Sequence, residues 1–68
     1  MNVFLSVVFP DDCNWDKVIK IVDKYKNAHS FEFSHALYYT GDFETSEELV
    51  QELSKLHYRM HIMRNIDN

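Results

Sequence analysis

The stretch VFLSVVF, residues 3–9, decides the fold of this chain. It is almost continuously apolar, it is rich in β-branched and aromatic side chains, and it ends at Pro10. A short apolar run of this kind is typical of a strand in the middle of a sheet. Because strand side chains alternate between the two faces, its odd-numbered residues would face a helical layer, whereas Phe4 and Val8 would face away from that layer.

The residues that follow predict an amphipathic helix. Apolar side chains recur at helical spacing from Trp15 to Tyr25, with charged residues between them, which indicates a helix over roughly residues 13–28. An aspartate at position 11 or 12 would cap its beginning.

Residues 31–39 alternate between apolar and other side chains, which indicates a half-buried strand. No glycine or proline marks a turn here, so one long strand is favoured over two short strands that would meet near residues 34–36. His35 falls among the inward side chains and would be buried and hydrogen-bonded there. The alternation predicts that Phe31, Phe33, Leu37 and Tyr39 face inward. It places Glu32, Ser34, Ala36 and Tyr38 on the open side.

A second helix is predicted after Thr40-Gly41-Asp42, the one strong turn signal in the chain. Thr45 and Glu48 have the spacing of a capping box, and leucines and a valine at helical spacing follow them. The C-terminal region fits two structures. Alternation of Tyr58, Met60 and Ile62 indicates a strand within residues 57–64, whereas a spacing of three and four from Leu49 to Met63 would continue the helix. A strand is favoured, because a sheet of only two strands is marginal.

These elements predict an α+β fold that forms a single compact domain over residues 1–68. It would be a small two-layer sandwich with two helices on one face of the sheet. The element order is β-α-β-α-β or, if residues 31–39 form two strands, the ferredoxin-like order β-α-β-β-α-β.

Size, charge and cysteine content limit the possible functions. A 68-residue chain buries only about 60% of the surface that its unfolded form exposes, so few apolar residues are free to line an enclosed active site. A homodimer would add burial and is an expectation. No run of about 20 apolar residues could span a membrane. One cysteine cannot pair within the chain, and the first nine residues lack the positive charge and cleavage site of a signal peptide; both favour the cytoplasm. Residue types with AT-rich codons are abundant, which is a pointer to a phage or mobile element.

Few residues in the sequence indicate catalysis, metal binding or phosphate binding. Asp11, Asp12 and Cys13 cluster at the first strand-to-helix junction, but nearby carboxylates would oppose a cysteine thiolate there. His57 and His61 could share a metal ion only on a helix, because on a strand they lie about 13 Å apart. With one glycine, a phosphate-binding loop is nearly excluded. The sequence therefore predicts no metal site, no cofactor and no enzymatic activity.

Two surfaces are predicted to bind a partner. One is an acidic segment, residues 42–52, whose alternative explanation is a solvated helix face with acids favourable to its dipole. The other is the open face of the sheet. The net charge of −4 opposes nucleic-acid binding.

The function expected is that of a small regulatory protein acting through protein–protein contact, as an inhibitor, antitoxin-like factor or adaptor. The alternative is a small metal-dependent nuclease or nucleic-acid-binding dimer that uses Asp11 or Asp12 with Arg59 and His61. The acidic partner-binding residues are Asp42, Glu44, Glu47, Glu48 and Glu52. Those of the open face are Phe4, Val8, Tyr38, Arg59 and His61.

Overall fold

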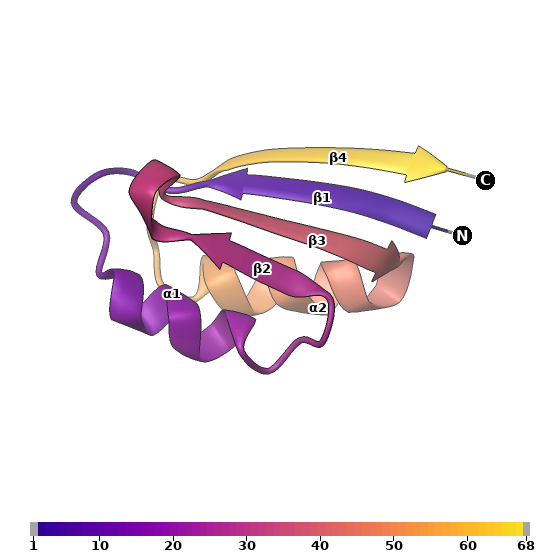
Figure 1. The fold of residues 1–68 in the computed structure, drawn as a ribbon, viewed down its shortest axis with the longest axis horizontal. Helices are drawn as coiled ribbons and strands as arrows, with labels where there is room; N and C mark the ends of the chain where they lie inside the picture. The colour runs from indigo at the N-terminus through magenta and orange to yellow at the C-terminus, as the bar shows by residue number, and fades with distance from the viewer. Residues whose placement is uncertain (1, 68) are drawn as a thin grey trace.

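The computed structural model describes residues 2–67, which fold into one sheet covered on one side by two helices (Figure 1). The four strands are antiparallel in the order β2-β3-β1-β4. This is the ferredoxin-like order, so the predicted fold class is confirmed, in its second variant. The elements along the chain are β1 (Asn2–Val8), α1 (Trp15–Val22), β2 (Ala28–Phe31), the 3-10 turn η1 (Glu32–Ser34), β3 (Ala36–Asp42), α2 (Phe43–Ser54) and β4 (His61–Asp67).

The core lies between the sheet and the helices, with β1 at its centre. Leu5 of β1, Leu37 of β3, Val18 of α1 and Leu49 of α2 are fully inaccessible to solvent and belong to one apolar cluster. Burial of each such side chain contributes about 1.5–3 kcal/mol. The predicted division of β1 is confirmed: its odd-numbered residues are buried, and Phe4 and Val8 are exposed. No helix within residues 2–67 combines the length and apolar character needed to cross a membrane.

The prediction of one long strand over residues 31–39 is wrong. The chain turns through η1, and His35 ends this turn in the left-handed region, with a φ of 50°. A left-handed backbone is costly for most residues, so such a turn usually contains glycine. Because this turn has histidine at that position, it could not be recognised from the sequence. The His35 ring stacks on Trp15 with 5.4 Å between ring centroids, and its carbonyl accepts a 2.8 Å hydrogen bond from the Phe9 amide. These contacts offset the backbone strain.

Helix α1 begins and ends elsewhere than predicted, and α2 begins earlier than predicted. α1 is capped by Asn14, whose side chain accepts a 3.1 Å hydrogen bond from the Asp16 amide, rather than by an aspartate at 11 or 12. It ends at Val22 instead of residue 28, because the chain must turn before β2 pairs with β3 from Ala28 onward. The expected capping box is not formed either. The carboxylate of Asp42, the last residue of β3, accepts from the Thr45 amide, so α2 begins without an intervening turn.

The only glycine lies within a strand, although the sequence indicated a turn there. Gly41 pairs with Val3 in the β1–β3 ladder. A Cβ atom at this position would lie 2.2 Å from the Tyr39 hydroxyl oxygen, so the buried Tyr39 side chain lies across the space that any other residue would fill. Glycine here provides room for a neighbouring aromatic ring, which is a known reason for glycine inside a strand.

The C-terminal segment forms a strand, as favoured, but later in the chain. β4 pairs with β1 over seven residues, from His61 opposite Val8 to Asp67 opposite Asn2. Residues 55–60 form the connection from α2 to β4, in which His57 has a φ of 61°. The Tyr58 hydroxyl accepts a 2.8 Å hydrogen bond from the Asn14 amide, which ties this connection to the beginning of α1. Since His57 precedes the strand and helix α2 has already ended, the two histidines do not share a helix face.

Candidate functional site

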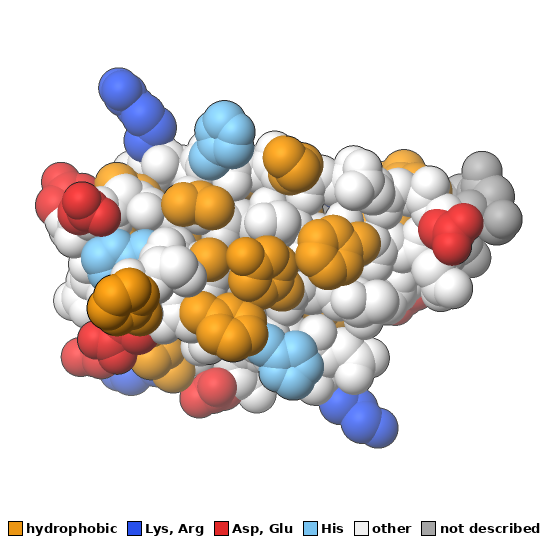
Figure 2. Space-filling view, turned by 45° about the horizontal axis from the view of Figure 1, so that its top comes forward, with side chains coloured by type: hydrophobic (Ala, Val, Ile, Leu, Met, Phe, Trp, Pro, Cys, Tyr) orange, Lys and Arg blue, Asp and Glu red, His pale blue; other side chains and the backbone are white. Residues whose placement is uncertain are grey.

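The face of the sheet opposite the helices is open and largely apolar. Figure 2 shows hydrophobic side chains gathered across the middle of this face. Phe4 is 45% exposed, Phe31 49% and Met63 59%, and Val8 and Tyr38 are exposed as well. An apolar cluster spread over all four strands is unusual for a surface that meets only water. We call this set, Phe4, Val8, Phe31, Tyr38 and Met63, the open-face cluster.

Three aromatic rings form a row across the open-face cluster. Phe4 of β1 and Tyr38 of β3 lie 6.0 Å apart between ring centroids, and Phe31 of β2 lies 5.4 Å from Tyr38 in an edge-to-face arrangement. Antiparallel pairing fixes the row, because Tyr38 lies between Ser6 on one side and His29 on the other. Aromatic pairs at these separations attract one another, so the three rings form one continuous aromatic surface.

The strand positions of this face carry no lysine or arginine within residues 2–67. The ring of polar residues around the open-face cluster is mostly neutral, with His29 on β2 and His61 on β4 at the two margins. Its acids, Asp42 and Asp67, lie at one end of the sheet. In Figure 2 the basic side chains lie at the outer corners of the view, away from the apolar row. The face therefore offers apolar contact with little charge.

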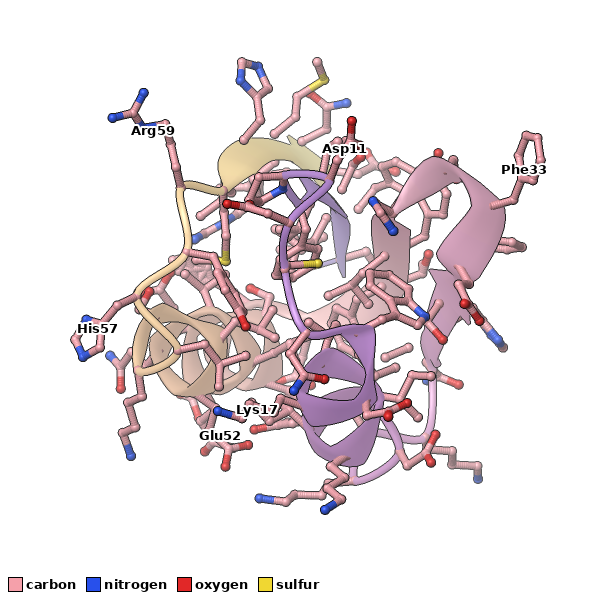
Figure 3. All side chains as sticks on the ribbon, turned by 90° about the vertical axis from the view of Figure 1, so that its left-hand side faces the viewer. Asp11, Lys17, Phe33, Glu52, His57 and Arg59 are labelled. Carbon is pink, nitrogen blue, oxygen red and sulfur yellow. The ribbon has the colours of Figure 1, made fainter. Side chains whose placement is uncertain are left out.

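Predicted members of this face fall into two groups. Phe4, Val8, Tyr38 and His61 lie on it, in the register that pairs Val8 with His61. Arg59 precedes β4 and points away from the body of the molecule (Figure 3). The structure also corrects the phase of residues 31–34, because the turn interrupts the alternation assumed for one long strand. Phe31 lies on the open face opposite Ala36, and Phe33 projects fully into solvent from η1. Glu32 and Ser34 lie in that turn instead of on a strand.

Three of the five acidic residues in segment 42–52 have partners inside the molecule. Asp42 caps α2, and its hydrogen bonds with Thr45 lower its pKa. Glu47 pairs with Arg64 of β4 at 2.5 Å. Glu52 of α2 accepts hydrogen bonds from the Tyr25 hydroxyl at 2.7 Å and from the Lys24 ammonium at 2.9 Å, which lower its pKa.

These acids therefore serve to join α2 to β3, β4 and the end of α1. Glu44 and Glu48 are exposed and have no ion pair within residues 2–67. A partner-binding role for the acidic segment stays a prediction, and its intramolecular role is the one that the geometry supports.

Cys13 lies at the junction after β1, in surroundings that disfavour its thiolate. Cys13 is half-buried, and burial together with the charge of Asp12 raises the pKa of its thiol, which disfavours the reactive thiolate. The expectation of a hydrogen-bonded, inward His35 is met only in part. This side chain is half-buried against Trp15, and its Nδ1 atom lies 3.4 Å from a carboxylate oxygen of the exposed Asp11.

No cluster of three or more histidine, cysteine or acidic side chains within residues 2–67 could hold a metal ion. A pocket of about 350 Å³ opens where the ends of β1, β3 and β4 meet, beside Phe4, Thr40 and Asn65. Asp67 is the one ionisable residue among those lining it. This pocket extends the apolar character of the open face and holds no acid–base pair.

Comparison with protein-family models, with curated proteins and with solved structures gives no match for this chain.

Proposed function

We propose that this chain is a small non-enzymatic binding protein whose open-face cluster docks onto another protein, as an inhibitor or adaptor does. The supporting observation is the row formed by Phe4, Tyr38 and Phe31, which lies on adjacent strands and is exposed to solvent. The core does not need these rings, because it is complete on the helix side of the sheet. The partner has an apolar, weakly charged contact surface, and the encounter takes place in the cytoplasm.

A single-stranded nucleic acid is the principal competing ligand. Exposed aromatic residues on the central strands of such a sheet can stack with bases. Binding of that kind also needs a basic groove for the phosphates, and the strand positions of this face lack lysine and arginine. The chain carries a net charge of −4, which adds repulsion. A protein partner fits both the aromatic row and the low charge.

The decisive experiment compares three forms of the full chain as immobilised bait in a lysate divided into an untreated and a nuclease-treated half. They are the wild type, the face variant Phe4→Ser/Tyr38→Ser and the acid variant Glu44→Lys/Glu48→Lys, which changes exposed residues without an ion pair. We expect one stoichiometric protein on the wild type and the acid variant and its loss from the face variant. The captured protein is then purified and recombined with labelled chain, and amide shifts are expected at β1 and β3.

Two outcomes would contradict this proposal. Loss of capture in the acid variant together with retention in the face variant would assign binding to the acidic segment instead. Capture that disappears after nuclease treatment would identify nucleic acid as the ligand, as would saturable binding of a fluorescent oligonucleotide that depends on Tyr38. Circular dichroism of each variant confirms that the bait is folded.

A further inference from the structure

The two edges of the sheet differ in how well they are protected. β2, at one edge, has four residues and runs directly into η1. β4, at the other edge, has seven residues and pairs only with β1, so its outer backbone groups have no partner within residues 2–67. It contains no proline and no lysine, two of the usual devices that prevent strand addition at an edge, and its inward-facing charge, Arg64, is paired with Glu47 of α2.

β4 is also apolar where a protected edge would be polar. Ile62 and Ile66 lie on the helix side, where they pair with Val7 and Val3, yet they are 40% and 50% exposed. Figure 1 shows β4 extending along the outer side of the sheet, with α2 lying beneath its inner strands. The helices therefore leave an apolar margin on the underside of this edge.

A second copy of the chain can pair with β4 in one symmetrical way. An antiparallel pair of identical strands requires a two-fold axis perpendicular to the sheet. Rotation about that axis leaves the helices of both copies on the same side of the sheet. Two residues that lie opposite each other across the pair then point to the same face only if the axis lies midway between the two copies of one residue. Placed at Arg64, the middle of β4, it pairs all seven residues. Axes at Met63 or Asn65 leave residues at the strand ends unpaired.

The Arg64 register is also chemically complementary. It sets Ile62 of each copy opposite Ile66 of the other, so the two exposed apolar side chains cover one another on the helix side. It sets His61 opposite Asp67 on the open face, where an imidazole N–H can donate to a carboxylate. Shifting the axis to Met63 or Asn65 sets an isoleucine opposite an arginine.

The arginine on the axis does not oppose this pairing. Like charges directly opposite each other normally destabilise a strand pair. Here each Arg64 side chain is turned toward α2, where it pairs with Glu47 and lies 5.2 Å from the centre of the Phe43 ring. Its charge is thus compensated within its own chain.

We propose that two copies of this chain associate through their β4 strands into one continuous eight-stranded sheet, with the two-fold axis at Arg64. The dimer covers Ile62 and Ile66 and joins two open faces into one surface. This association stands independently of the function proposed above, because it uses the edge of the sheet and leaves the open-face cluster exposed.

Cysteine cross-linking tests the dimer and its register together. In a Cys13→Ser background, Ile62→Cys and Ile66→Cys chains are oxidised separately and as an equimolar mixture. Opposed Cα atoms lie about 4.5–5.5 Å apart, within disulfide range, whereas two copies of position 62 are offset by about 13 Å along the strand. We expect a disulfide-linked dimer in the mixture alone. Met63→Cys and Asn65→Cys, each tested alone, are expected to stay monomeric on non-reducing gels.

Sedimentation of the unmodified chain tests the association itself. We expect a dimer whose association is at least about tenfold weaker in Ile62→Lys, because a lysine blocks the apolar margin. Phe4→Ser, on the open face, is the matched control and is expected to leave the dimer intact. A monomer at all concentrations up to about 1 mM would overturn the proposal. Cross-linking of Met63→Cys or Asn65→Cys alone would overturn the register. A dimer that is lost in Phe4→Ser and kept in Ile62→Lys would overturn the assignment of the interface to the β4 edge.

Discussion

The two faces of the sheet use the same kinds of residue for different purposes. Leu5 and Phe4 are neighbours on β1, yet Leu5 is fully buried beneath the helices and Phe4 is exposed on the open face. On the helix side, apolar side chains fill a continuous core with residues of α1 and α2. On the open side, a row of aromatic rings has no covering layer. Hydrophobicity on the first face stabilises the fold, whereas on the second we propose that it serves contact with another molecule.

The largest expected effect comes from breaking the covered face. Leu5→Ala would remove a fully buried side chain from the central strand, with loss of its burial and formation of a cavity. We expect the free energy of unfolding to fall by about 2–5 kcal/mol, a large share for a domain of this size. Denaturant titration followed by circular dichroism measures this change. A loss below about 1 kcal/mol would show that the core tolerates collapse at this position.

A smaller effect is expected from overfilling the same face. In Gly41→Ala the new methyl group would collide with the Tyr39 ring, which is itself buried. We expect a destabilisation of about 1–3 kcal/mol, because the ring must leave its position. The double variant Gly41→Ala/Tyr39→Leu removes the ring and should lose little more stability than Tyr39→Leu alone. Additive losses in this cycle would contradict the steric explanation.

Substitutions on the open face should affect stability least while they affect binding most. Phe4→Ser and Tyr38→Ser remove side chains that are already partly solvated and lie outside the core. We expect each to change the free energy of unfolding by at most about 1 kcal/mol, chiefly through loss of the aromatic contact between them. Thermal denaturation of both variants beside Leu5→Ala tests the contrast. Losses as large as that of Leu5→Ala would mean that both faces are structural.

The stability of the helical layer is also expected to depend on pH, through the polar contact between α2 and the residues that follow α1. Hydrogen bonds from Tyr25 and Lys24 hold the Glu52 pKa below its ordinary value of 4.5, so this carboxylate stabilises the fold above that pH and ceases to do so as pH falls through its folded pKa. Burial and the bond with Glu52 raise the pKa of Tyr25 to about 12 from 10.0, so its contribution is lost as pH rises through this range.

Glu52→Gln tests this dependence. We expect the variant to show a shallower loss of stability between pH 5 and pH 3 than the wild type, measured by thermal melting at a series of pH values. Glu44→Gln, at an exposed helix position without an ion pair, is the control and should follow the wild-type acid limb. Identical acid limbs for all three proteins would exclude Glu52 as a contributor.

Local patterns predicted the elements better than their boundaries. The apolar run of residues 3–9 and the helical spacing from Trp15 onward were sufficient to predict β1 and α1. The alternation near the C-terminus was sufficient to predict a last strand, which the structure has as β4. They could not predict the turn at His35, since its left-handed backbone is sustained by Trp15, a residue twenty positions earlier. Nor could they predict the role of Gly41, which depends on the direction of one neighbouring ring.

The candidate site shows the same division. The alternation of β1 was enough to identify Phe4 and Val8 as outward-facing, because strand side chains alternate by geometry alone. Phe31 could not be recognised as part of the same surface, since its face depends on where the chain turns. The acids of residues 42–52 formed an apparent patch in the sequence, but ion pairs to Arg64 and Lys24 exist only once β4 and α1 lie beside α2.

The sequence by itself determined the fold class, the division of β1 into a buried and an exposed row, and the net negative charge of the chain. These properties follow from periodicity and composition, which act between neighbouring residues. Only the tertiary structure decided where the chain turns, which acids are paired, and that β4 is an edge strand that exposes Ile62 and Ile66. Each of these depends on contacts between segments distant in sequence, and the free energy of such contacts is not encoded in any local pattern.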